Sequence, residues 1–293
     1  MHKSILVSIL SSAAVLLSCA STTLAVTLYG TAFIGSEGPA TLYTIDSTTG
    51  TETLVGLTGY SRVGAIDFDP STGTLYGVGV KTNDGIGGFE LITLDITTGV
   101  ATSVGLTGVT SSFQDISFRS DGTLFAYAGG SLYTLDLMSG AATLLGPTGL
   151  PGGGGNATAF DPSNVLFNIN ESNISTLNQT NGAATDTMVD VDYPIELGTN
   201  PRANAMDYDL TTGILYASVV HGIEGPNANF IAQIDLATGD VSNIHSTILG
   251  LDALAVFQQN GNETSVPEGM STFWLALPLI GLLAVHRRIR RVS

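Results

Sequence analysis

Short stretches of alternating apolar and polar residues recur along the chain, separated by turn-forming sequences. In one full unit they lie near Ala65–Phe68, Thr74–Val80, Glu90–Asp95 and Ala101–Val104. Alternation with a period of two residues, together with β-branched and aromatic content, indicates strands rather than helices. Each full unit is therefore predicted to hold four short β-strands.

One phrase marks the third strand of each unit and the turn that follows. It has two apolar residues three positions apart, then Asp or Asn, two variable residues, usually Thr or Ser, and Gly. The acidic or amide side chain is expected to accept backbone N–H hydrogen bonds, and the Gly to supply the positive φ of a bulged hairpin turn. The phrase occurs at Leu42–Gly50, Leu91–Gly99, Leu132–Gly140, Ile174–Gly182 and Ile231–Gly239.

Successive copies of this phrase lie 49, 41, 42 and 57 residues apart. Four strands in about 40–45 residues is the spacing of a propeller blade. The two longer intervals contain an insertion at Lys81–Phe89 and longer loops near Asp190–Arg202 and His221–Asn229. The spacing therefore predicts a ring of blades with three enlarged connections.

The two ends of the repeat region complement each other. The repeat region begins partway through a unit, at Thr27–Gly30, so this unit lacks its first strand. The region ends with Asp252–Val256, which matches that missing strand. We therefore predict an all-β fold over residues 26–265, a β-propeller of five four-stranded blades whose last blade is closed by the N- and C-terminal strands. Such closure removes exposed sheet edges. An open β-solenoid is the alternative, although it would not need a split unit.

The repeat resembles the broad family of secreted bacterial propellers with Leu-Tyr-x-Ile-Asp…Thr-Gly units, a resemblance that names no activity. Residues 1–25 are predicted to be an export signal, because a weakly basic start precedes an apolar run at Ile5–Leu17 and small residues lead to Thr23-Leu24-Ala25. The alternative is a lipoprotein signal at Leu16-Leu17-Ser18-Cys19, with Cys19 lipidated after cleavage. Either signal takes the body out of the cytoplasm.

The C-terminal segment, residues 266–293, has three parts in order. Val266-Pro267-Glu268 precedes an apolar run at Phe273–Val285, and a cluster of four arginines follows at 287–291. This order resembles the PEP-CTERM sorting signal, which implies cleavage by an exosortase-type enzyme and delivery to the cell surface or extracellular matrix. Gly269-Met270 departs from the commonest form. An ordinary C-terminal anchor is the alternative, and in both cases the membrane is contacted only through this short segment.

Charge and residue usage narrow the classes of function. Between residues 26 and 265 there are 4 basic and 24 acidic residues, so nucleic acid is not an expected partner. The single cysteine, Cys19, precedes the body, which excludes disulfides and thiol chemistry there. His221 and His245 are the only histidines in the body, so a multi-histidine metal centre is not expected.

The repeated aspartates are candidate ligands for calcium ions. Asp46, Asp95, Asp136 and Asp235 fit hairpin turns better than calcium sites, because each stands alone and calcium takes roughly 6–8 oxygens. Better calcium candidates are two pairs that alternation puts on one side of a strand, although turn capping is favoured for these as well. The pairs are Asp67 with Asp69 and Asp207 with Asp209.

The column of residues before the innermost strands is the predicted ligand site. Aligned blades would bring these residues to one mouth of the central channel, with two arginines in the adjoining loops. Alternatively, the column hydrogen-bonds the ends of the inner strands. The column is Gly64, Gln114, Asn156, Asn204 and Asp252, the arginines are Arg62 and Arg202, and longer loops with Asp84, Glu171, His221 and Glu224 should open on the same face.

Catalytic motifs are not recognisable. Gly152–Gly155 lacks the following Lys and helix of a phosphate-binding loop, and no Ser stands in a strand–elbow–helix setting. We expect a binding module for glycan, exopolysaccharide or a surface partner, with calcium as the one cofactor the acids would allow. A hydrolase or lyase acting on extracellular polysaccharide through carboxylates is the second hypothesis. A purely structural surface protein is the third.

Overall fold

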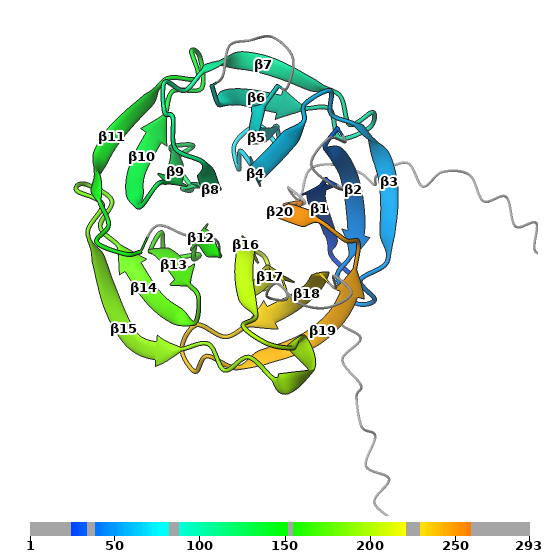
Figure 1. Ribbon diagram of the computed structural model, residues 1–293, viewed down its shortest axis with the longest axis vertical. Coiled ribbons are helices and arrows are strands. Elements are labelled where there is room, and N and C mark those ends of the chain that lie inside the picture. The colour runs from blue at the N-terminus through cyan, green and yellow to red at the C-terminus, as the bar shows by residue number, and fades with distance from the viewer. Residues whose placement is uncertain (1–24, 34–38, 82–87, 152–154, 221–228, 259–293) are drawn as a thin grey trace, which may run out of the picture. The chain divides into compact units, whose positions relative to one another are not determined.

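The described residues form a ring of five antiparallel sheets with four strands each (Figure 1). This computed structural model describes residues 25–33, 39–81, 88–151, 155–220 and 229–258. Within these ranges every regular element is a strand, except the short 3-10 helix η1 (Ile195–Leu197). The predicted five-bladed β-propeller is therefore confirmed.

Four blades are each formed by consecutive strands, as the repeat unit predicts. The first contains β4 (Arg62–Phe68), β5 (Leu75–Val80), β6 (Glu90–Leu94) and β7 (Ala101–Leu106), and the second β8 (Phe113–Phe118), β9 (Leu124–Ala128), β10 (Ser131–Leu135) and β11 (Ala142–Pro147). The third contains β12 (Asn156–Phe160), β13 (Leu166–Asn170), β14 (Asn173–Leu177) and β15 (Ala184–Asp190), and the fourth β16 (Arg202–Asp209), β17 (Ile214–Val220), β18 (Asn229–Ile234) and β19 (Val241–Thr247).

The fifth blade joins the two ends of the repeat region. It has the order β20-β1-β2-β3, with β20 at Leu251–Val256, β1 at Thr27–Ala32, β2 at Thr41–Asp46 and β3 at Glu52–Leu57. In the register of β1 and β20, Leu28 lies opposite Val256. The predicted closure by exchange of terminal strands is confirmed, and the open solenoid is excluded.

The innermost strands β4, β8, β12, β16 and β20 surround the centre of the ring (Figure 1). They run in the same direction, because residues near their starts contact one another and residues near their ends do so too. We call the side where they begin the strand-start face and the side where they end the strand-end face. The blades pack through aliphatic and aromatic side chains such as Leu28, Ile66 and Ile116, each at most 1% exposed.

The hairpin turns have the predicted construction. The Asp95 carboxylate accepts the backbone N–H groups of Thr97 at 2.8 Å and Thr98 at 3.1 Å, and Gly99 closes the turn with a φ of 79°. Hydrogen bonding by the Thr97 side chain is the main reason that the pKa of Asp95 lies below its ordinary value. These turns all lie at the strand-end face, because β2, β6, β10, β14 and β18 end there.

The predicted export signal and sorting tail fall largely or wholly in residues 1–24 and 259–293, which lie outside the described residues. In the part of the chain that is described, no helix has both the length and the apolar character needed to cross a membrane. The propeller itself forms one compact unit that ends at Gln258.

Candidate functional site

The predicted channel-mouth column lies at the strand-start face, and its polar side chains are engaged with protein groups. Asp252 accepts from Arg62 Nε at 2.7 Å and from Asn204 Nδ2 at 2.9 Å. This network ties together the inner strands β4, β16 and β20. Gln114 accepts the backbone N–H of Gly129 at 3.1 Å. Asn156 is fully buried and accepts a hydrogen bond from Asn170.

The structure thus brings Arg62, Asn204 and Asp252 together, while Gln114 and Asn156 bond within their own blades. Of the loop residues expected on this face, Glu171 lies there, whereas Asp84, His221 and Glu224 are outside the described residues. A large pocket on this face lies next to the column, at Arg202.

Arg202 begins β16 and lines a pocket with a volume of about 620 Å³. Small-molecule sites commonly have volumes of roughly 300–1,000 Å³. The pocket lies between the third and fourth blades, because its walls come from the β13–β14 turn and from the connection between β15 and β16. Its polar lining includes Glu171, Ser172, Asp192 and Asn200.

Tyr193 joins the two walls of this pocket. Its hydroxyl donates to the carbonyl of Glu171 at 3.1 Å and accepts the backbone N–H of Ala203 at 2.9 Å. Burial raises the pKa of Tyr193, so the hydroxyl remains a donor at neutral pH. A backbone hydrogen bond of 2.7 Å from Val191 to Ser172 adds a second link. The pocket is therefore held open by bonds between its walls.

Two lining residues have unusual backbone geometry. Glu171 has a φ of 56° and Asn200 a φ of 52°, in the left-handed region. Asn tolerates this region because its short side chain can bond locally, whereas for Glu it costs about 1–2 kcal/mol. The surrounding structure holds both residues in this conformation, and both line the pocket.

Arg202 is held by its aliphatic stem. A Cβ placed on Gly155 would lie 2.5 Å from the Arg202 Cδ and 2.8 Å from its Cβ, so the stem lies directly against the glycine backbone. The Nε atom of Arg202 is buried and has no hydrogen-bond partner among the residues that the structure describes. An unsatisfied buried donor costs about 1–3 kcal/mol, and more when the group is charged.

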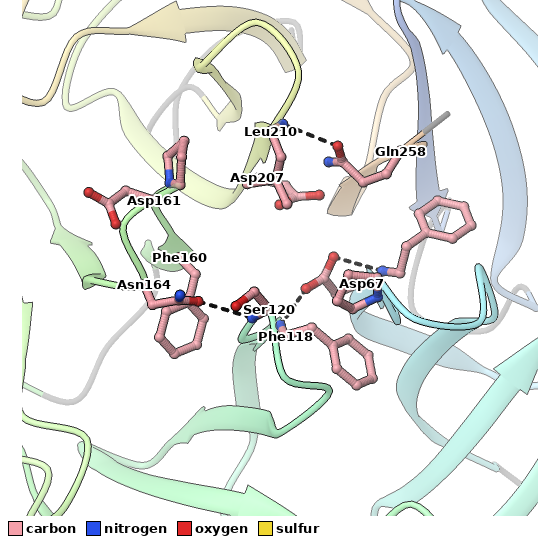
Figure 2. Close-up of a pocket in the computed structure, with 12 residues that line it drawn as sticks. Asp67, Phe118, Ser120, Phe160, Asp161, Asn164, Asp207, Leu210 and Gln258 are labelled. Atoms are coloured by element: carbon pink, nitrogen blue, oxygen red, sulfur yellow. Dashed lines mark hydrogen bonds between the residues drawn. The ribbon is translucent and has the colours of Figure 1, made fainter. Parts of the chain in front are cut away.

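A second, smaller pocket of about 160 Å³ lies at the strand-end face, around the inner carboxyls Asp67 and Asp207 (Figure 2). Both side chains project into this opening, from β4 and β16 (Figure 2). Asp67 accepts the backbone N–H of Phe118 at 2.6 Å, and Asp207 accepts that of Val256 at 2.7 Å. Each carboxylate therefore links its blade to the next one.

Both carboxyls have a pKa above the ordinary value of an aspartate. Burial is the main cause, and the nearby charge of Asp207 adds to it, so that the pKa of Asp67 lies well above its ordinary value. Burial likewise raises the pKa of Asp207 to about 7. At neutral pH the two groups together hold a proton, because two ionised carboxylates cannot lie side by side in a buried site.

The calcium candidates separate into two kinds in the structure. Asp69 accepts from the backbone N–H of Ser71 at 2.8 Å, and Asp209 from that of Thr211 at 2.9 Å, so both cap turns. Asp67 and Asp207 lie together in the channel instead of with their sequence neighbours. In the described ranges no three His, Cys, Asp or Glu side chains are grouped so as to hold a metal ion.

Asp115 was not predicted as a special residue. It is fully buried and accepts from the backbone N–H groups of Thr158 at 2.8 Å and Met206 at 3.4 Å, so it joins three inner strands. Burial raises its pKa well above the ordinary value. A sequence signal exists: at this position of the inner strand the other four blades have Ala65, Ala157, Ala205 and Ala253.

Comparison with known proteins identifies related folds only. The laminin–nidogen complex structure contains a chain that is 12% identical, with 79% of this chain and 98% of that chain covered and a TM-score of 0.49. TolB from Acinetobacter baumannii is 15% identical over 77% of this chain and 54% of that chain, with a TM-score of 0.46. A protein of unknown function from Bacteroides caccae is 11% identical over 80% of this chain and 100% of that chain, with a TM-score of 0.46.

Bacterial propellers are thus among the solved structures with a similar fold, and their functions vary. No protein-family model matches the sequence, and neither does any curated protein.

Proposed function

We propose that this chain is an exported propeller that acts at the cell surface or in the extracellular matrix, where it binds glycan or another surface component through its strand-start face. The observation that carries the proposal is the pocket of about 620 Å³ beside Arg202. It combines a ligand-sized volume with convergent polar groups from two adjacent blades, as binding sites do. At the strand-end face, the pocket around Asp67 and Asp207 has a volume of only about 160 Å³, and a pocket beside the hairpin turn after β2 has about 380 Å³.

A glycan-binding screen with residues 26–265, at controlled calcium concentration, tests the proposal. Ser172→Trp should fill the pocket and abolish binding, because Ser172 lies on its wall. Ser120→Trp is the matched control, since Ser120 lies at the other pocket, on the strand-end face. If wild-type protein binds no glycan and no surface partner, the proposal fails. If only Ser120→Trp abolishes binding, the assigned face is wrong.

A hydrolase acting on extracellular polysaccharide is the second candidate. The observation that favours it is that two carboxylates, Glu171 and Asp192, lie in the same pocket. Glycoside hydrolysis needs two such groups across the scissile bond. Polysaccharide turnover that is lost in Glu171→Gln and in Asp192→Asn would support this candidate, and unchanged oligosaccharide profiles after long incubation would exclude it.

Delivery to the surface is proposed from the two chain ends. An export signal within residues 1–25 and a PEP-CTERM-like tail over 266–293 together predict cleavage by an exosortase-type enzyme. Intact mass of the surface-exposed protein should show loss of the tail. Pro267→Ala with Glu268→Ala should leave the tail attached and the protein in the membrane fraction. A tail that is retained in wild-type protein would instead indicate an ordinary anchor.

A further inference from the structure

Arg202 differs from the other basic residues of the described body. Arg62 pairs with Asp252 at 2.7 Å, Lys81 with Glu90 at 3.6 Å and Arg119 with Asp121 at 2.6 Å. Each of these three cations also lies over an aromatic ring. Arg202 has neither an ion pair nor a ring contact among the described residues. In a body this acidic, a guanidinium with no carboxylate partner in the described ranges is unusual.

The position of Arg202 is fixed by the fold. Its stem lies against Gly155, whose φ of 79° is closed to most side chains, and its backbone pairs with Val220 in the sheet. The buried Nε has no partner in the described part of the chain, and the residue lines the large pocket. A guanidinium offers donors in a planar fork that matches a carboxylate with two parallel hydrogen bonds. The site therefore offers the donor half of such a pair.

The remaining polar groups restrict the ligand further. Glu171 and Asp192 can only accept hydrogen bonds when ionised, and Ser172 and Asn200 can donate or accept. A ligand for all of these groups carries one anionic group for Arg202 and several hydroxyls for the acceptors. The acidic body, with 4 basic and 24 acidic residues between 26 and 265, repels a densely charged polyanion.

We infer that the pocket binds a hydroxylated carboxylate, the chemistry that an acidic sugar presents at the end or branch of a glycan. Arg202 takes the carboxylate, while Glu171 and Asp192 accept hydrogen bonds from ring hydroxyls. This inference rests on the proposed glycan-binding function and names the ligand class of the same pocket. It also gives a reason for the last glycine of the run Gly152–Gly155, because Gly155 makes room for the arginine stem.

The test compares matched ligands on residues 26–265, the compact propeller with its short following segment. A neutral oligosaccharide with one terminal uronic acid is titrated against the same oligosaccharide with that carboxyl reduced to an alcohol, by calorimetry at fixed ionic strength. Wild-type protein should bind the acid form about 10- to 100-fold more tightly, as expected for loss of a charge-assisted hydrogen-bond pair. Arg202→Gln should abolish this preference, and Arg202→Lys should retain part of it because the charge remains.

Arg119→Gln is the control, because it removes the same charge at the strand-end face. It should leave the preference unchanged, and an equal loss in Arg119→Gln would show that the effect is long-range charge and overturn the inference. Equal binding of acid and reduced oligomers would overturn the inference while leaving the proposed function intact. Binding of no glycan at all would overturn both. Equally strong competition by inorganic sulfate would identify a general anion site and refute the carboxylate assignment.

Discussion

The stability of the propeller should fall as the pH rises from about 4 to about 7, because the channel carboxyls are protonated in the folded protein. Burial raises the pKa of Asp207 from 3.8 to about 7 and that of Asp67 in the same direction. Folded protein therefore binds more protons than unfolded protein in this interval. Stability from these groups is complete below pH 3.8 and is lost as the pH rises through about 7.

The magnitude follows from the pKa of Asp207. A rise from 3.8 to about 7 corresponds to at most about 4 kcal/mol, since one pH unit is worth about 1.4 kcal/mol per proton. This free energy is an upper limit, because the Asp207 side chain is partly exposed toward the pocket. Between pH 5 and 7, the free energy of unfolding should fall by about 1.4 kcal/mol per pH unit for each additional proton that the folded protein binds.

Asp207→Asn removes one titrating group and should reduce the slope of the pH profile, while Asp67 and Asp115, whose pKa values are also raised, keep the rest of it. Asn has one carbonyl oxygen, whereas Asp207 accepts from Tyr208 at 2.8 Å and Val256 at 2.7 Å with separate oxygens. The variant should therefore be less stable than wild type at acidic pH. The diagnostic quantity is for this reason the change in unfolding free energy per pH unit, and not its absolute value. Urea unfolding should be followed by circular dichroism, because the only tryptophan, Trp274, lies beyond the propeller.

Asp46→Asn is the matched control, since hydrogen bonding by Thr48 lowers the pKa of Asp46 and the group is ionised in both states above pH 5. Its profile from pH 5 to 8 should keep the wild-type slope. If Asp207→Asn keeps that slope as well, the carboxyl pair does not hold the proton and the electrostatic account of the channel is refuted.

Three further changes test the packing. Truncation after Gly250 removes β20 and leaves the edge of β1 unpaired. Size-exclusion chromatography should then show aggregates in place of a monomeric ring. A folded monomer would contradict the closure argument. Gly155→Ala should lower the urea-unfolding free energy by about 1–3 kcal/mol, because its Cβ would lie 2.5 Å from the Arg202 Cδ, and wild-type stability would show that the stem moves freely. Asp69→Ala should lower the free energy of unfolding by about 1–2 kcal/mol at pH 7. Burial raises the pKa of Asp69, but hydrogen bonds from Ser71 and Thr72 outweigh this effect and lower it. The difference in stability between variant and wild type should therefore shrink below pH 3.8, and a constant difference would refute this assignment.

The architecture could be predicted because its signals are local and repeated. Alternation defines each strand, and the Asp and Gly of the hairpin phrase define each turn, as at Asp95 and Gly99. The split unit at Thr27 and Val256 then specifies closure. A third repeated motif marks the ends of the outer strands. Its buried threonines donate to backbone carbonyls 18 residues upstream, and they are Thr58, Thr107 and Thr148.

The pocket could not be predicted in the same way. Asp192, Tyr193 and Asn200 belong to the β15–β16 connection, which has no counterpart in the other blades and so no repeat to align. Their assembly with Glu171 depends on the Tyr193 hydroxyl, a contact between two loops that sequence spacing does not specify. Asp115 could have been found, because it is the one acid in a column of alanines.

The pairing of β20 with β1 also sets the order in which the molecule can be completed. Leu28 and Val256 lie at opposite ends of the described chain, so the final sheet cannot form until the last strand has been synthesised. Contacts between such distant segments are slow to form. Until then β1 has an unpaired edge, the kind of surface through which incomplete chains aggregate.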